Sequence, residues 1–294
     1  MKGKAVILLS TFNGEKYLSQ LLNSLEKQEN VDFDIFIRDD GSSDRTREII
    51  IEYSKLFSNI RYIFENNIGY AKSFWRLLQL SSGYDYYAFC DQDDIWKKNK
   101  LYKAILMFKT ENIPLLYTSR VIAINNDGKI ISHNAFGTSG ILNAFQAFQR
   151  SIIPGCVMVM NKRLHYYLCK YNGFMESHDW ATYCIASVFG KVMYDDNSYI
   201  YYRITENNTI GIPTKFQTLK LQISRLFKKS LHTRSRFAHD FFLIFNKKIK
   251  RSVLKDSIRS LGFYREKKSE KIKLLFNFNF KGLIFKIYVL LNRV

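Results

Sequence analysis

Short apolar runs alternate with amphipathic stretches through the first ninety residues of the chain. The apolar runs have the length of buried strands, and they predict strands at residues 4–10, 33–38, 59–64 and 84–90. The stretches between them place apolar residues at helical spacing and predict helices at residues 15–28, 45–57 and 71–80, with Ser43 or Asp44 as the cap of the second. This alternation predicts βαβ units, and therefore an α/β fold with a mostly parallel sheet flanked by helices.

The pattern is mixed from residue 115 onward and changes again near residue 214. Strands are predicted at residues 115–124, 156–160, 191–194 and 199–203, a helix at residues 179–188, and a turn at residues 125–128. From about residue 214 the chain becomes a series of basic helices rich in Phe, Leu and Ile. We therefore expect a main domain over residues 1–210 and a basic helical extension over residues 211–294.

Positive charge is concentrated in the predicted extension. The net charge is +19, and residues 211–294 hold 21 lysines and arginines against 4 acidic residues. The main basic runs are at residues 227–229, 247–251 and 267–273, and such asymmetry favours a polyanion: a membrane surface, a nucleic acid or an acidic substrate. Lysines punctuate the apolar residues 274–291, as in a helix at a lipid interface, so we prefer an anionic membrane surface to an ordinary basic surface. The aromatic residues lie in apolar runs, which disfavours nucleic-acid binding.

Several classes of protein are disfavoured by what the sequence lacks. No stretch reaches the roughly 18 uncharged apolar residues of a membrane span, and the apolar run at residues 5–9 is too short for a signal peptide. The cysteines form no C-x-x-C pair and no zinc spacing, which predicts free thiols in a reducing compartment for Cys90, Cys156, Cys169 and Cys184. The Gly-rich loops of dinucleotide enzymes and P-loop ATPases are also absent, so a metal ion is the natural device for holding a diphosphate.

Acidic clusters follow two of the predicted strands, at the edge where parallel sheets bind their ligands. Asp91, Asp93 and Asp94 follow the strand at residues 84–90. Three carboxylates within four residues repel one another unless a cation is present, and their hard oxygens suit Mg²⁺ or Mn²⁺. A solvated acidic loop is the alternative. Asp40, in the second cluster, is suited to a ribose or base, although a turn with a helix cap also accounts for that cluster.

A third candidate is the stretch from His178 to Trp180. Asp179 is placed to act as a general base near the metal, and His178 is a candidate to share that role. The alternative for Asp179 is an N-cap, because it lies at the start of a predicted helix.

These stretches together resemble the family 2 glycosyltransferases with a GT-A (Rossmann-like) fold, and among them bacterial rhamnosyltransferase-like members. The matching stretches occur in the family's order over about residues 4–210. They are residues 9–18 (LSTFNGEKYL), 37–46 (IRDDGSSDRT), 67–69 (NIG) before 73–74 (SF), 91–96 (DQDDIW), 154–158 (PGCVM), 178–180 (HDW) and 202–203 (YR).

The resemblance implies a role for each matching position. Residues implied to bind the nucleotide sugar are Thr11, Asn13, Glu15, Asp40 and Asp91. The implied ligands of Mn²⁺ or Mg²⁺ are Asp93 and Asp91, and the implied catalytic base is Asp179. The implied borders of the acceptor pocket are Gly155, Cys156, His178 and Trp180. Thr205 stands where relatives often have a histidine near the metal, which puts ligation on that side in doubt.

The resemblance also implies the reaction. We expect an inverting transfer of one sugar from a nucleoside-diphosphate sugar, since the Q-x-x-R-W signature of processive synthases is absent. The implied donor is dTDP-rhamnose, with UDP-glucose or UDP-galactose open, and the implied acceptor is a lipid-linked oligosaccharide of a bacterial capsule, O-antigen or wall polysaccharide. The expected location is cytoplasmic, at the inner face of the cell membrane. A nucleotidyltransferase, a nucleic-acid-binding protein and a catalytically dead scaffold are the rival hypotheses.

Overall fold

A computed structural model describes most of the chain. The described residues are 3–108, 112–136, 141–150, 153–205, 232–277, 279–280, 282–292 and 294. The expected boundary near residue 210, the start of the basic helices near residue 214 and the basic run at residues 227–229 lie outside them. Within the described part, no helix is long and apolar enough to cross a membrane.

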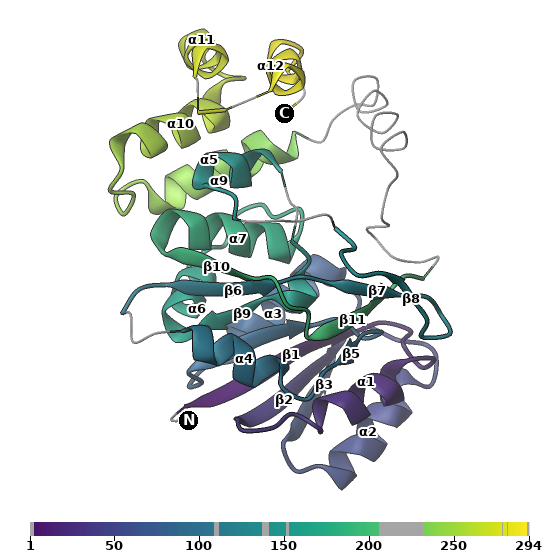
Figure 1. Cartoon of the computed structure of the whole chain (residues 1–294). Coiled ribbons are helices and arrows are strands. Elements are labelled where there is room, and N and C mark those ends of the chain that lie inside the picture. The colour runs from purple at the N-terminus through teal and green to yellow at the C-terminus, as the bar shows by residue number, and fades with distance from the viewer. Residues whose placement is uncertain are drawn as a thin grey trace.

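The central sheet has seven strands in the order β10-β6-β9-β4-β1-β2-β3 (Figure 1). Their bounds are Lys4–Thr11 (β1), Asp32–Asp39 (β2), Ile60–Phe64 (β3), Tyr86–Cys90 (β4), Leu115–Ser119 (β6), Val159–Asn161 (β9) and Lys191–Asp195 (β10). Every pairing is parallel except those of β9, which runs antiparallel to β4 and β6. The prediction of an α/β fold with a mostly parallel sheet is confirmed.

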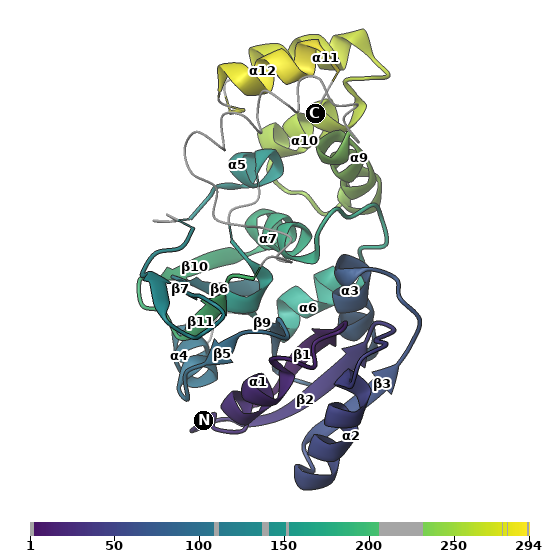
Figure 2. The same cartoon turned by 90° about the vertical axis from the view of Figure 1, so that its right-hand side faces the viewer.

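Helices pack on both faces of this sheet (Figure 2). One face is covered by α1 (Leu18–Leu25), α2 (Thr46–Leu56) and α4 (Lys100–Met107), and the other by α3 (Tyr70–Leu80), α6 (Lys162–Cys169) and α7 (His178–Phe189). The three helices predicted in the first ninety residues are present: α1 and α2 are shorter than predicted, and α3 begins one residue earlier. Helices α4 and α6 were not predicted. Arg45 rather than Ser43 or Asp44 occupies the N-cap position of α2, although the Asp44 carboxylate accepts the Thr46 amide in the first turn at 3.0 Å.

A second, smaller sheet corrects the prediction of one strand at residues 115–124. Strand β6 ends at Ser119, and the next strand, β7 (Ile122–Ile124), belongs to a different sheet. That sheet also contains β5 (Ile95–Trp96), β11 (Ile200–Arg203) and β8 (Ile130–Ser132). Between these two strands, the Arg120 amide donates a hydrogen bond to the Asp195 carbonyl. The strand predicted at residues 156–160 begins instead as a 3₁₀ turn, η1 (Gly155–Val157), because an apolar run is buried whichever backbone it adopts.

The C-terminal helices stack at one end of the molecule (Figure 1). They are α9 (Thr233–Phe245), α10 (Ser252–Phe263), α11 (Lys268–Phe276) and α12 (Leu283–Leu290), with α5 (Ala144–Gln149) between them and the body. Helix α9 buries Phe237, Phe241 and Phe245. Phe237 packs on Trp180 of α7, Phe245 packs on Phe189 of the same helix, and both Phe237 and Phe241 pack on Phe148 of α5. The first of these helices therefore shares the core of the main domain.

The parallel strands bring three chain segments to one edge of the sheet. Thr11 lies opposite Asp39 in the pairing of β1 with β2, and Leu9 lies opposite Cys90 in the pairing of β1 with β4. Asp40 and Asp91 come directly after β2 and β4, so both acidic clusters flank the end of β1. This arrangement is what strand-end placement predicted.

Candidate active site

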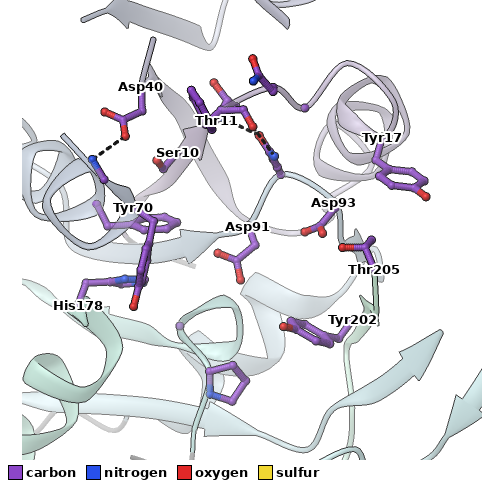
Figure 3. A pocket seen from close by; sticks show the side chains of 18 of the residues that line it. Ser10, Thr11, Tyr17, Asp40, Tyr70, Asp91, Asp93, His178, Tyr202 and Thr205 are labelled. Carbon is purple, nitrogen blue, oxygen red and sulfur yellow. Dashed lines mark hydrogen bonds between the residues drawn. The ribbon is translucent and has the colours of Figure 1, made fainter. Parts of the chain in front are cut away.

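A cavity of about 740 Å³ opens at this edge of the sheet (Figure 3). Eight of the predicted site residues line it: Thr11, Asn13, Asp40, Asp91, Asp93, Gly155, His178 and Asp179. They come from the ends of β1, β2 and β4, from η1 and from the first turn of α7. Residues separated by up to 168 positions in the sequence thus share one cavity.

Asp40 is held in place by a buried arginine. Arg38 is fully buried, and its guanidinium donates to Asp40 Oδ1 at 2.5 Å and to Glu65 Oε2 at 2.8 Å. The amides of Ile68 and Gly69 donate to Oδ1 and Oδ2 at 2.8 and 2.9 Å. A carboxylate with this many charge-assisted bonds is fixed in orientation before a ligand arrives.

Asp39 has a supporting role beneath the cavity. It is buried, and it accepts hydrogen bonds from the Thr11 hydroxyl at 3.1 Å, from the Ser42 amide at 3.0 Å and from Arg47 Nε at 2.6 Å. The carboxylate therefore ties the end of β1 to the loop after β2. The turn predicted for the second acidic cluster is confirmed, and Asp39 organises it.

The glutamine inside the acidic stretch joins two strand ends. Its amide accepts the Phe12 N–H at 2.8 Å and donates to the Phe12 carbonyl at 3.0 Å, so Gln92 links the loop after β4 to the loop after β1. Gly14 makes room for it, because a Cβ at that position would lie 2.4 Å from Gln92 Oε1. No local sequence pattern assigns Gln92 a role beyond spacing two aspartates.

The acidic stretch concentrates negative charge against the cavity. Burial, together with the charges of Asp93 and Asp179, raises the pKa of Asp91 to about 7. Burial also raises the pKa of Asp93, and that of Asp94 well above its usual range. Two buried cations partly offset this charge. Lys100 donates to the Cys156 carbonyl at 2.8 Å with its pKa lowered to about 8 by burial, and Arg203 donates to the Asp93 carbonyl at 3.0 Å.

The donor set fits a hard divalent cation. Asp91 and Asp93 both line the cavity, whereas Asp94 is buried and its Oδ1 accepts the Arg203 amide at 3.2 Å. Asp94 Oδ2 has no hydrogen-bond partner among the described residues, so the cluster contains a buried oxygen whose hydrogen-bonding capacity is unsatisfied. The Cys156 thiol also lies near Asp91 and Asp94, but it is a softer ligand than the oxygens that Mg²⁺ and Mn²⁺ prefer. Carboxylate oxygens of this kind are ligands for Mg²⁺ or Mn²⁺.

Asp179 is the second residue of α7 and lines the cavity from that helix rather than from a strand end. Its Oδ1 accepts the Trp180 amide at 2.6 Å and also the Ser177 hydroxyl. Within the described part of the chain, both hydrogen bonds to this carboxylate end on Oδ1, which leaves Oδ2 for a ligand. The predicted N-cap alternative does not apply, since Ser177 occupies the N-cap position.

The remaining predicted residues lie outside the lining of the cavity. Glu15 accepts the Arg45 amide at 2.9 Å and so supports the start of α2. Cys156 is buried within η1. Trp180 is 1% exposed, donates to the Ala147 carbonyl at 2.7 Å and packs on Phe237. Adjacent residues of a helix point about 100° apart, so Trp180 faces the core while Asp179 faces the cavity.

Sequence reasoning missed the residues that brace the site. Arg38 and Lys100 are buried cations, and Tyr70 lines the cavity at the start of α3. Arg203, noted only as part of a matching stretch, also donates to the carbonyls of Asn125 and Asn126, which fixes the turn between β7 and β8. Nothing in the local sequence distinguishes these cations from exposed ones. Thr205 does line the cavity (Figure 3).

Comparisons with known proteins agree with the fold and with the family that the sequence resembles. The family model for glycosyl transferase family 2 matches residues 6–255. The chain is similar to the dTDP-rhamnosyl transferase RfbG of Shigella flexneri, with 31% identity over 292 residues that cover 91% of this chain and 97% of the relative. It is also similar to the UDP-Glc:alpha-D-GlcNAc-diphosphoundecaprenol beta-1,3-glucosyltransferase WfgD of Escherichia coli, with 34% identity over 43% of this chain and 50% of that protein.

The structural comparison concerns the fold alone. TarS residues 1–349 of S. aureus, solved in complex with UDP-GlcNAc, superimposes with a TM-score of 0.60 at 17% identity, covering 99% of this chain and 88% of that one. The expected GT-A fold is thereby confirmed. Because the family model spans most of the chain and the similarity to RfbG spans nearly all of it, this protein belongs to glycosyl transferase family 2.

Proposed function

We propose that this glycosyltransferase moves one rhamnosyl residue from dTDP-rhamnose to a hydroxyl of a lipid-diphosphate-linked oligosaccharide, with inversion at the anomeric carbon. One observation carries the proposal: the strand ends with Thr11 and Asp40, the acidic pair Asp91 and Asp93, and Asp179 surround one cavity. The choice of donor is supported by the name of RfbG, and that of a lipid-diphosphate acceptor by the name of WfgD. The name of WfgD also makes a UDP-hexose the second candidate donor.

The nucleotide takes the side of the cavity formed by β1 and β2. Asp40 Oδ2 accepts one amide and keeps lone pairs for a base N–H or a ribose hydroxyl, and Thr11 and Asn13 lie beside it. Asp91 and Asp93 are the residues that would hold Mn²⁺ or Mg²⁺. When bound, the ion supplies charge neutralisation for the diphosphate leaving group.

Asp179 acts as the base on the opposite side. Its free Oδ2 takes the proton of the acceptor hydroxyl as that oxygen attacks the anomeric carbon. The bond from this carbon to the diphosphate breaks, and the bonding electrons leave with the nucleoside diphosphate. A single displacement inverts the anomeric configuration. Gly155 borders the path of the acceptor, and Cys156 and Trp180 support that wall from within the core.

The C-terminal helices provide a surface for the membrane. Ile272 and Phe276 lie one turn apart on α11 and are 56% and 71% exposed, and Leu290 and Leu291 at the end of α12 are 56% and 53% exposed. Three exposed lysines lie close to these apolar residues in the sequence: Lys268 and Lys273 on α11, and Lys267 directly before it. This combination fits an anionic lipid surface at the inner face of the cell membrane, where lipid-linked acceptors lie. Phe280 is buried, so part of the apolar run predicted to face lipid forms the core of the extension instead.

The membrane surface is tested by sedimentation with vesicles containing anionic lipid. We expect binding that falls with salt and is weakened in Phe276→Ser, while Leu56→Ser, an equally exposed leucine on α2 (73%), retains it. Equal binding to neutral vesicles, or preferential binding to DNA in a gel shift, would contradict this assignment.

The reaction is tested by supplying purified protein with Mn²⁺ or Mg²⁺ and a panel of nucleotide sugars, with and without a membrane lipid extract. We expect release of dTDP from dTDP-rhamnose in the presence of the ion, and its loss in Asp93→Ala. Release of UDP from a UDP-hexose would select the second candidate donor. Release of pyrophosphate, or no release with any donor and extract, would refute the proposal.

A further inference from the structure

His178 is a buried polar residue that the mechanism above does not use. It is the first residue of α7, it is 4% exposed, and its ring lines the cavity. Neither Nδ1 nor Nε2 has a hydrogen-bond partner within the described part of the structure. A buried group left without its hydrogen bonds costs free energy, so an unpaired imidazole beside a cavity requires an explanation.

The surroundings of the ring are aromatic. Phe74 stacks on it with ring centres 4.0 Å apart, Phe89 meets it edge-on at 4.7 Å, and Tyr70 does so at 6.2 Å. Burial lowers the pKa of His178 to about 4, so at neutral pH the ring has one N–H donor and one acceptor nitrogen. A neutral ring of this kind suits a sugar hydroxyl, which both donates and accepts.

Gly155 leaves the space that the ring occupies. A Cβ at this position would lie 2.4 Å from His178 Nε2, so any other residue would displace the imidazole. A half-turn of the ring about its Cβ–Cγ bond exchanges nitrogen and carbon positions in the same plane. The ring can therefore place its nitrogens at either of two sets of positions without leaving the face of Phe74.

The position of the ring separates the two sugars of the reaction. A lipid-linked oligosaccharide is too large to enter a cavity of about 740 Å³ and must approach from its mouth, whereas the single sugar of the donor fits inside. His178 is buried in the cavity wall and precedes Asp179 in the sequence. In Figure 3, Asp91 lies between His178 and Asp93. The donor sugar must lie between the diphosphate near Asp91 and the base, which brings it to this wall.

We propose that His178 is a specificity-determining residue that forms a hydrogen bond with a hydroxyl of the donor sugar. In this role it does not border the acceptor pocket. This inference rests on the proposed function, because it needs a nucleotide sugar in the cavity.

The test compares the binding of dTDP and of dTDP-rhamnose by calorimetry, without acceptor, for the wild type and His178→Phe. Phenylalanine keeps the stack on Phe74 but cannot form the hydrogen bond. We expect the Kd of dTDP to be unchanged and that of dTDP-rhamnose to rise about fivefold to tenfold, the worth of one net hydrogen bond. His178→Gln, which keeps a donor and an acceptor, should recover part of this difference.

His165 provides the matched control. It too is a buried histidine stacked on an aromatic ring, 3.9 Å from Tyr87, but its Nε2 is bonded to the Leu78 carbonyl at 2.8 Å and it does not line the cavity. His165→Phe should change the two dissociation constants equally or not at all. A His178→Phe variant that behaves in the same way would overturn the inference.

Failure of the proposed function gives a different result. If wild type binds a UDP-hexose in place of dTDP-rhamnose, the rhamnosyl assignment falls, and the same comparison of UDP with UDP-hexose decides the role of His178. If the wild type binds no nucleotide sugar, both proposals fall together.

Discussion

The two sides of the cavity differ in how completely their polar groups are paired. On the nucleotide side, Asp40 accepts three hydrogen bonds, Asp39 is tied to both neighbouring loops, and Gln92 holds the backbone of Phe12 from both ends. On the base side, Asp179 has one oxygen left over, and His178 has neither nitrogen paired in the part of the chain that is described.

This difference shows how one cavity is organised for two tasks. A nucleotide is the same in every cycle, and a rigid carboxylate binds it at the lowest entropic cost. The groups that meet the reacting sugar must instead change partners during the reaction, so they are held in position by packing and kept unpaired until substrate arrives. Variants on the two sides should accordingly affect binding and turnover differently.

The largest effect is expected from the base. Asp179→Asn keeps the size of the side chain and the hydrogen bonds to one oxygen but removes the proton acceptor. We expect transfer to fall by about 10²–10⁴, while the Kd of dTDP measured by calorimetry stays the same. A folded variant with near-normal turnover would mean that Asp179 is not the base.

The packing of the base side is tested at Gly155. Gly155→Ala places a methyl group against His178 Nε2, and overpacking of this kind lowers the free energy of unfolding by about 1–3 kcal/mol. The loss should shrink when His178→Ala is introduced as well, because the alanine removes the ring that the methyl group displaces. Urea unfolding of the two single variants and the double variant measures this coupling, and additive losses would show that the contact is unimportant.

The buried imidazole should make stability depend on pH. Its pKa of about 4 lies below the ordinary value near 6.5, so between these values the unfolded chain takes up a proton that the folded chain refuses. Stability should therefore fall as pH falls, with His178 contributing a loss of about 2 kcal/mol from pH 7 to pH 5.

The measurement is the difference between wild type and His178→Phe in urea unfolding at the two pH values. Taking the difference removes the contributions of Asp91 and the other carboxylates, which both proteins share. Parallel curves would mean that the imidazole is paired or solvated in solution.

The smallest effect is expected on the nucleotide side. Gln92→Ala removes two hydrogen bonds to the exposed backbone of Phe12, and water partly replaces each of them. The binding free energy of dTDP should therefore become less favourable by about 1 kcal/mol. Turnover at saturating donor should stay nearly constant, because the base side is untouched. A large loss of turnover with unchanged Kd would contradict the division of the cavity into two sides.

The sheet and the acidic clusters at its edge could be predicted from sequence because both depend on local patterns. The ends of the predicted strands and their parallel direction place Asp40 and Asp91 at the same edge before any contact is known. The end of β6 at Ser119 could not be predicted, because the apolar run continues past it. Two sheets become evident only from the pairing of β6 with β10 and of β7 with β11.

The bracing of the site was out of reach for a different reason. Arg38 and Lys100 have the same local sequence character as surface cations, and their burial depends on carboxylates and carbonyls distant in the chain. Which face of a helix is buried also depends on packing. For this reason Trp180 faces the core, whereas the neighbouring Asp179 lines the cavity.

A crystal structure of the complex with dTDP and Mn²⁺ would test the division of the cavity into two sides most directly. We expect that the base and ribose lie beside Thr11 and Asp40, that Asp91 or Asp93 would hold the ion near the diphosphate, and that Asp179 Oδ2 remains unpaired. A nucleotide bound elsewhere, or a diphosphate out of reach of both aspartates, would contradict it.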